Sequence, residues 1–294
     1  MRTEKKYVNP DEKQISKRIG KNKAARVVFF IATFFGLAVL AILIIRIVTQ
    51  GASYLNLDLL TNFASRNPEN AGIKAALLGT LWVMSVTSPV ALILGIGTAI
   101  YLEEYAPDNK FTRFIELNIS NLAGVPSIVF GLLGLTLFVR YLGMGRSVLA
   151  GGLTMALMIL PVIVVSSKEA IRSIPQEQYE AGYAMGATKW QIIRTVVVPA
   201  ATPGILTGAI LSLSRAIGET APLLMIGAMT FIAYVPESVL SSFTVLPIQI
   251  FSWASRPQAE FQAVAAAGSV VLLIILIVMN SIAIGIRNKF SKRN

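Results

Sequence analysis

Apolar residues are gathered into six long runs that polar segments separate. Each run approaches or exceeds the roughly 20 residues that a bilayer-spanning helix needs. The first run is longer than a signal-peptide core and has no small-x-small cleavage site after it, so we expect it to be retained. The pattern predicts an all-α membrane protein with six transmembrane helices, at residues 27–48, 74–101, 117–141, 147–167, 199–232 and 262–286.

Four prolines fall inside the expected helices, at Pro126, Pro161, Pro203 and Pro222. Proline is tolerated in a membrane helix when neighbouring groups satisfy the backbone atoms that it frees. Each run is therefore predicted as one span, although the fifth run is unusually long.

The composition agrees with a membrane protein and excludes several functions. The chain is 54% hydrophobic and only 14% charged, against about a quarter charged in soluble domains. Its net charge of +11 does not indicate nucleic-acid binding, because the basic residues lie just outside the apolar runs and form no stripe with aromatic residues. There is no histidine and no cysteine. We therefore expect no zinc site of the usual type, no histidine-based catalysis and no cofactor.

The basic residues also predict the orientation in the membrane. With the N-terminus inside, nineteen Lys and Arg lie in cytoplasmic segments and four in external loops. Lys and Arg accumulate on the cytoplasmic side of membrane proteins, so both termini are predicted to be cytoplasmic in a multi-pass protein of the cell inner membrane. Residues 1–26 hold nine basic and three acidic residues and are predicted to form a flexible cytoplasmic tail.

The cytoplasmic segment 168–198 carries signals for two short helices. Ser173 with Gln176, and Thr188 with Gln191, have the spacing of capping boxes. Gly186 stands where the first helix would end in a left-handed conformation. The segment is therefore predicted to fold as helix, sharp turn and helix.

Three aromatic side chains, Tyr179, Tyr183 and Trp190, give this segment apolar anchors. Such helices either lie on the membrane surface or dock into a partner protein. The pattern alone leaves both interpretations open.

The stretch "EAGYAMGATKWQIIRTVVVPAA" resembles the signature of ABC-importer permeases, which reads Glu-Ala-Ala, three residues, Gly, nine residues and Ile-x-Leu-Pro. Gly182 replaces the second alanine, and two valines replace isoleucine and leucine. The resemblance implies that the segment contains the coupling helix, which docks on a cytoplasmic ATPase. The matching residues are Glu180, Ala181, Gly182, Gly186, Val196, Val198 and Pro199.

Two further stretches, "LAGVPSIVFGLLGL" from Leu122 and "RAIGETAPLL" from Arg215, resemble the permease subunits of the phosphate-specific importer family, Pst. The ending "GETAPLL" is closer to the PstA branch than to the PstC branch. The resemblance covers about residues 70–290. It implies a type I ABC-importer permease core over that range, including segment 168–198, that forms half of a membrane pathway for inorganic phosphate.

The same resemblance implies a non-catalytic subunit with three protein partners. These are a second, PstC-like permease, a dimer of PstB-like ATPases and a PstS-like phosphate-binding protein outside the membrane. The chain contains no G-x-x-x-x-G-K-[ST] motif that could bind ATP phosphates. ATP hydrolysis is therefore expected on the partner ATPase.

Among 26 basic and 15 acidic side chains, only Arg215 and Glu219 fall deep within an expected span. A central charge costs roughly 2.5–3.5 kcal/mol on insertion scales, and residues four apart share one face of a helix. One interpretation is a pathway or gating role, because a guanidinium suits phosphate and the carboxylate could hold it or accept a bond from a protonated phosphate oxygen. The competing interpretation is an ion pair that only fixes helix packing.

Two rival functions remain open. The substrate could be another oxyanion, such as phosphonate, sulfate or molybdate. A membrane-embedded transferase is a remoter alternative, disfavoured because the chain lacks histidine and clustered intramembrane acids.

Two weaker features complete the picture. Gly204 and Gly208 form a GxxxG motif that could let another helix approach closely, although such motifs often mark ordinary packing. The acidic residues Glu103, Glu104 and Asp108 are interpreted as a solvated turn.

Overall fold

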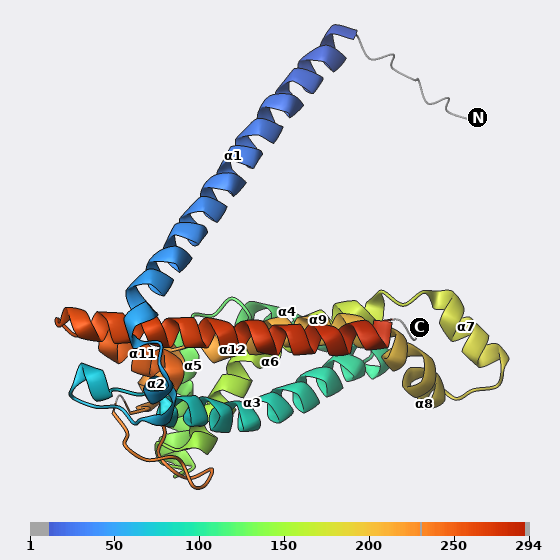
Figure 1. Cartoon of the computed structure of the whole chain (residues 1–294). Coiled ribbons are helices and arrows are strands. Elements are labelled where there is room, and N and C mark those ends of the chain that lie inside the picture. The colour runs from blue at the N-terminus through green and yellow to red at the C-terminus, as the bar shows by residue number, and fades with distance from the viewer. Residues whose placement is uncertain (1–11, 230, 292–294) are drawn as a thin grey trace, which may run out of the picture. The chain divides into compact units, whose positions relative to one another are not determined.

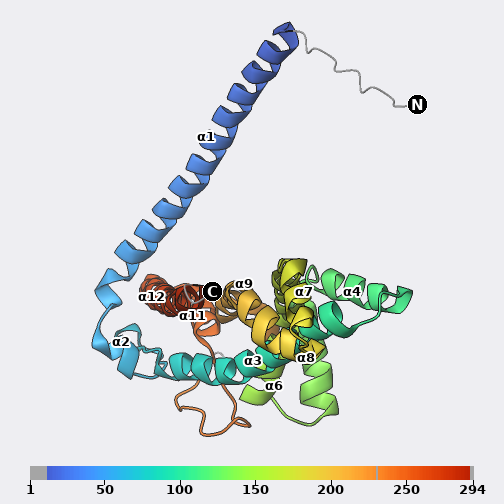
Figure 2. The ribbon, with the colours of Figure 1, turned by 90° about the vertical axis from the view of Figure 1, so that its right-hand side faces the viewer.

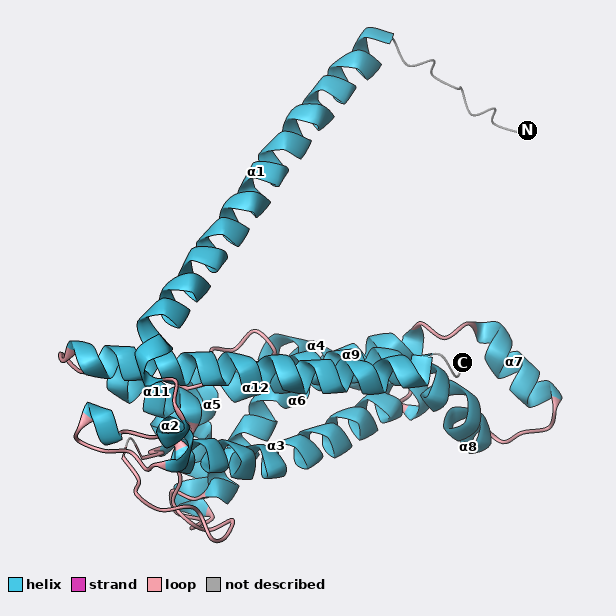
Figure 3. Ribbon diagram, viewed as in Figure 1, coloured by secondary structure: helices cyan, strands magenta, loops and turns pink. Residues whose placement is uncertain are grey.

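The computed structural model describes residues 12–229 and 231–291. Within these ranges all regular structure is helical and no strand occurs (Figure 3). The chain divides into two units, Met1–Gln50 and Gly51–Asn294. Each unit is considered by itself.

The first unit is built from α1, Glu12–Gly51, a single helix of 40 residues. It contains the predicted span 27–48. The prediction of a flexible tail is wrong for residues 12–26, which are helical; residues 1–11 lie outside the described part. The Lys, Arg, Gln and Ala of this stretch are good helix formers, and they extend a helix that the apolar run has already nucleated.

Four long helices form the frame of the second unit (Figure 1). They are α3 Lys74–Ile100, α6 Val148–Arg172, α9 Val198–Gly218 and α12 Ala259–Ser291. The predicted spans 74–101, 147–167 and 262–286 are thereby confirmed as single helices. Figure 2 shows α12 and α4 on opposite sides of α9.

Shorter elements close the two ends of this frame. Those at the end where α3 begins and α6 starts are η1 Ala52–Tyr54, α2 Leu57–Thr61, η2 Pro68–Asn70 and α11 Leu246–Ala254. At the opposite end lie η3 Tyr101–Tyr105, α7 Gln176–Ala184, α8 Lys189–Ile192 and η5 Ile193–Val197. The C-terminal end of α12 lies at this second end (Figure 1).

The third predicted span, 117–141, is not one straight helix. It consists of α4 Lys110–Leu122 and of α5 Ser127–Gly134, which continues as the π-helical turn η4 Leu135–Tyr141; the two parts are bent by 105°. The break has a local cause, because proline disfavours helical backbone at the residue before it, here Val125. The described residues therefore contain five long apolar helices, or six spans if the bent pair counts as one.

The fifth predicted span, 199–232, also breaks. The continuous helix starts at Lys189 and ends at Gly218, and Glu219 has extended backbone with φ −77° and ψ 134°. A separate short helix, α10 Ala221–Ile226, follows. Pro222 has no N–H to bond the Gly218 carbonyl, so the helix stops where that bond is missing.

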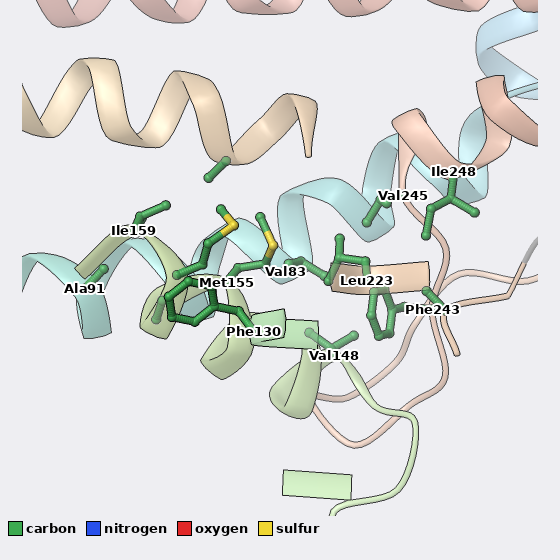
Figure 4. Close-up of a cluster of buried hydrophobic side chains, with 14 of the residues drawn as sticks. Val83, Ala91, Phe130, Val148, Met155, Ile159, Leu223, Phe243, Val245 and Ile248 are labelled. Atoms are coloured by element: carbon green, nitrogen blue, oxygen red, sulfur yellow. The ribbon is translucent and has the colours of Figure 1, made fainter. Parts of the chain in front are cut away.

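The core of the second unit lies between α3, α5 and α6. Buried side chains from these helices, among them Val83, Phe130 and Met155, meet Leu223 of α10 and Phe243 of the loop before α11 (Figure 4). The short helices α5 and α10 are thereby held rigidly beside α6.

The GxxxG motif brings α9 against α6. A Cβ atom on Gly204 would lie 2.7 Å from the Ala170 Cβ, and one on Gly208 would overlap the hydroxyl of Ser166. Only glycine permits this approach, so the motif has the helix-packing role that the sequence suggested.

Candidate functional site

Arg215 and Glu219 form an ion pair across the broken end of α9. The Arg215 Nε lies 3.3 Å from the Glu219 Oε1. The Arg215 side chain is 59% exposed and that of Glu219 only 18%. The expectation that both residues lie inside one helix is wrong, because Glu219 follows the last helical residue. The pair joins through one guanidinium nitrogen, so the remaining N–H groups of Arg215 point elsewhere.

A cavity of about 170 Å³ lies beside Arg215. Its wall is apolar apart from Arg215 and the hydroxyl of Ser212, and it opens at the break between α4 and α5. Such a setting places a permanently charged guanidinium beside an apolar wall, where it can form charge-assisted hydrogen bonds to an oxyanion. The lining residues are Leu122, Ala123, Val125, Phe130, Met158, Ile159, Val162, Leu211, Ser212 and Arg215.

The two short helices that follow the breaks pack against each other. A Cβ atom on Gly131 of α5 would lie 2.7 Å from the Pro222 Cα of α10. The break before α5 lines the cavity through Leu122, Ala123 and Val125. Irregular backbone at membrane depth is tolerated where it lines a cavity or is buried in protein, which fits this position.

A polar contact fixes the end of α9 against α12. The Ser214 hydroxyl lies 2.5 Å from the Asn280 Oδ1 of α12 and 2.7 Å from the Ile210 carbonyl. This contact fixes the position of the neighbouring residue, Arg215, along the axis of α12.

The predicted helix–turn–helix of segment 168–198 is present, with one difference. Gly186 has φ +76°, as expected of a left-handed turn. The Thr188–Gln191 capping box starts α8, and the Thr188 N–H donates to the Gln191 Oε1 at 2.7 Å. The prediction of a second capping box, formed by Ser173 and Gln176, is wrong. The Ser173 hydroxyl donates to the Ala170 carbonyl at 2.8 Å and closes α6.

Three of the motif residues of this segment lie on α7. Glu180 and Ala181 are exposed, whereas Gly182 faces α8, where its Cβ would lie 2.7 Å from the Ile192 Cγ1. Glycine at the position of the usual alanine therefore lets α7 and α8 pack closely. The segment does not touch Arg215 or Glu219, which lie at the other end of α9.

Exposed apolar side chains surround the turn between α7 and α8. They are Tyr183, Met185 and Trp190, and Met185 is 88% exposed. Exposed apolar side chains on a turn are suited to a partner protein or to the membrane surface.

The interpretation of Glu103 and Glu104 as a solvated turn is wrong. The Glu103 carboxylate accepts from the Arg172 Nε at 3.0 Å and lies 3.8 Å from the Lys168 Nζ. Its side chain is largely buried. The sequence carried a signal for this pairing, because Lys168 and Arg172, four residues apart, end α6 at the same edge where α3 ends in two acids.

Neighbouring charges extend this contact. The Lys168 Nζ lies 2.5 Å from the Glu116 Oε1 of α4. Asp108, by contrast, is exposed and pairs only with Arg113, at 3.2 Å, so the expectation of a solvated residue is confirmed for this member of the group.

Glu104 accepts a hydrogen bond from segment 168–198. The Tyr179 hydroxyl donates to the Glu104 Oε1 at 2.7 Å. Burial, together with this bond to a carboxylate, raises the pKa of Tyr179 well above its usual range. Both causes act in the same direction, because each disfavours the negatively charged phenolate.

Known proteins similar to this chain identify its family. Residues 91–293 match the family described as "Binding-protein-dependent transport system inner membrane component". The match covers more than half of the chain, and the chain belongs to this family.

Three relatives align over most of this chain. A protein of Bacillus subtilis named "Probable ABC transporter permease protein YqgI" is 34% identical over 255 residues, which is 83% of this chain and 87% of that one. "Phosphate transport system permease protein PstA 1" of Mycobacterium tuberculosis is 37% identical over 76% of this chain and 72% of its own length. "Phosphate transport system permease protein PstA" of Xylella fastidiosa is 30% identical over 91% and 93%.

Solved structures of ABC importers share the fold. A chain of the inward-facing MetNI methionine ABC transporter superposes with a TM-score of 0.61 at 21% identity and covers 73% of this chain and 94% of that one. A chain of a bacterial alginate ABC transporter gives a TM-score of 0.66 at 15% identity over 91% and 94%. The predicted type I ABC-importer permease fold is thereby confirmed.

We expect Tyr179 to remain protonated at a pH where free tyrosine ionises. Phenolate absorbance is titrated by ultraviolet spectroscopy in the wild type and in Tyr179→Phe. The difference between the two curves should show no phenolate signal at pH about 10, the ordinary tyrosine pKa. The raised pKa stabilises the folded state below that pH, and this stabilisation is lost as the pH rises through the folded-state pKa. A difference signal with an ordinary midpoint would contradict the described contact.

Proposed function

We propose that this chain is a PstA-type permease subunit of an ABC importer and forms half of the membrane pathway for inorganic phosphate. One observation carries the proposal: relatives named phosphate permease PstA, 30% and 37% identical, align with most of the chain. The fixed cation beside the cavity at Arg215 supports it, because a guanidinium offers paired donors that match phosphate oxygens.

The partners follow from the same proposal. A PstC-like permease completes the pathway, a PstB-like ATPase dimer hydrolyses ATP, and a PstS-like binding protein delivers phosphate. The exposed Tyr183, Met185 and Trp190 provide an apolar surface for the ATPase. Glu180, Ala181, Gly182 and Gly186 belong to the segment that couples the permease to this ATPase.

The proposed orientation places both termini in the cytoplasm. The C-terminal end of α12 lies at the same end of the second unit as α7 and α8 (Figure 1). A docking site for a cytoplasmic ATPase at α7 and α8 therefore requires a cytoplasmic C-terminus. The count of basic residues supports the same side for the N-terminus.

Arg215 is proposed to contact or gate the passing anion, with Glu219 as its resting partner. The single-nitrogen contact at 3.3 Å leaves further guanidinium donors for an oxyanion. When phosphate arrives, Arg215 can exchange part of its bond with Glu219 for bonds to the substrate. The carboxylate then offers an acceptor to a protonated phosphate oxygen, which sulfate lacks.

The substrate is tested with the complex purified with its partner subunits and reconstituted in proteoliposomes. ATP-dependent uptake of labelled phosphate is the expected result. If the complex instead prefers sulfate, molybdate or a phosphonate, that anion is the substrate and the phosphate proposal is wrong.

Arg215→Gln should reduce phosphate uptake by about 10- to 100-fold, the range expected from loss of a hydrogen bond to a charged group. Arg215→Lys should restore little, because an ammonium lacks the paired geometry. Uptake is measured in proteoliposomes, and co-purification of the partner subunits controls for assembly.

The double variant Arg215→Gln with Glu219→Gln separates the two interpretations of this pair. If Arg215 serves the anion, the double variant stays inactive although it assembles. Uptake near the wild-type rate would show that the pair only fixes packing, since no charge is then left unpaired.

Gly186→Val should leave the protein in the membrane but weaken ATPase association and abolish uptake. The substitution forces a β-branched residue into left-handed backbone at a cost of about 1–3 kcal/mol. Gly143→Val is a matched control, because Gly143 has a similar φ of +64° and open space around it but lies outside the coupling segment. Equal behaviour of the two variants would contradict a coupling role for the turn.

A further inference from the structure

The coupling helix α7 makes few buried contacts with the rest of the chain. None of its residues is buried. Tyr179 packs partly against the small cluster formed by Ala99, Ile171 and Ile192, and Gly182 touches Ile192. An element with so little buried surface needs polar contacts to move as one body with its neighbours.

The end of α3 directs two adjacent carboxylates toward different elements. Tyr101–Tyr105 forms a π-helical turn, η3, which carries Glu103 and Glu104. Glu103 faces α6, where it binds Arg172 and lies near Lys168. Glu104 instead faces the coupling segment, where it binds Tyr179.

Glu104 receives contacts from both halves of the coupling segment. Its carboxylate accepts from Tyr179 of α7 at 2.7 Å, and its backbone carbonyl accepts from the Lys189 ammonium at the start of α8. The same ammonium lies 5.1 Å from the centre of the Tyr105 ring. One turn of α3 therefore holds α7 and α8 together.

The carboxylates of Glu103 and Glu104 join different pairs of elements. Glu103 belongs to a set of charges that joins α3, α4 and α6, because Lys168 also binds Glu116. This set ties the ends of the long helices to one another. Glu104 is the acid that joins this frame to the segment expected to move with the ATPase.

We propose that Glu104 is a positioning residue, which with Tyr179 transmits displacement of the coupling segment to α3. The inference rests on the proposed function. α3 packs along α6 over the length of the unit, and α6 lines the cavity beside Arg215. A displacement of Glu104 is therefore applied to α3, which packs along α6, one of the helices that line this cavity.

The test compares transport with ATP hydrolysis in the reconstituted complex. In Tyr179→Phe the ring and its packing stay, and only the bond to Glu104 is lost. We expect phosphate uptake to fall about tenfold while ATP hydrolysis stays within about twofold of the wild type, as loss of one bond to a charged acceptor predicts. The ratio of ATP hydrolysed to phosphate transported rises accordingly.

A second variant gives a graded result. Glu104→Gln keeps an oxygen that can accept from Tyr179, so its ratio should lie between those of the wild type and Tyr179→Phe. The double variant should be no worse than Tyr179→Phe alone, because both changes remove one interaction.

Matched controls are Tyr101→Phe and Asp108→Asn. Tyr101 is an exposed tyrosine of the same π-helical turn, and Asp108 is an exposed acid nearby. Both controls should keep the wild-type ratio.

Three results would overturn the inference: a wild-type ratio in Tyr179→Phe, a changed ratio in both controls, or a parallel loss of uptake and ATP hydrolysis with the ATPase missing from the purified complex. The last result would assign Tyr179 to docking alone. Failure of the proposed function is recognised separately, because the wild-type complex would then hydrolyse ATP without transporting phosphate.

Discussion

The arrangement of this chain depends on one constraint: inside a bilayer every backbone N–H and C=O must find a partner within the protein. A long helix without proline, such as α12, satisfies the constraint along its length by itself. Where the helix stops inside the apolar layer, other protein groups must surround the freed backbone. The breaks before α5 and before α10 are two such places, and the helices that follow them pack together, with Gly131 on Pro222. The break before α5 and the last turn of α9, which carries Arg215, both line the cavity.

The second unit has charged groups in two places, beside the cavity and at the end near α7 and α8, and they are bonded differently. Arg215 stands beside the cavity with a single contact to Glu219, so its guanidinium can exchange partners. At the end of the unit that carries α7 and α8, Glu103, Lys168 and Glu116 are partly buried and satisfied by one another. A buried, mutually bonded set of charges resists rearrangement, whereas an exposed, singly bonded arginine does not. Under the proposed function, the rigid charges lie at the end that docks on the ATPase and the adaptable arginine lies beside the cavity.

The sequence predicted features that local chemistry determines. The length of the apolar runs was sufficient for α3, α6 and α12, and the Thr188–Gln191 box and the left-handed Gly186 depend only on residues close in the chain. Pro126 and Pro222 were interpreted as tolerated, because a proline that bends a helix and one that ends it look alike until the neighbouring helices are placed. Ser173 does not form the predicted capping box, because α6 continues to Arg172 and Ser173 closes its C-terminal end. The partner of Glu103 lies 69 positions away, and only the basic end of α6 signalled it. The partner of Glu104 lies 75 positions away, and no local pattern could identify it.

The central claim is that the cavity beside Arg215 is part of a water-accessible anion pathway. The chain has no cysteine, so single cysteines can report access of water-soluble thiol reagents. Leu211 lines the cavity and is 66% exposed, and Ile277 of α12 is 63% exposed. In the assembled complex, the account predicts that Leu211→Cys reacts, that phosphate under turnover with ATP slows the reaction, and that Ile277→Cys stays unreactive in lipid. A Leu211→Cys variant that is unreactive, or whose reaction is unaffected by phosphate, would contradict the account.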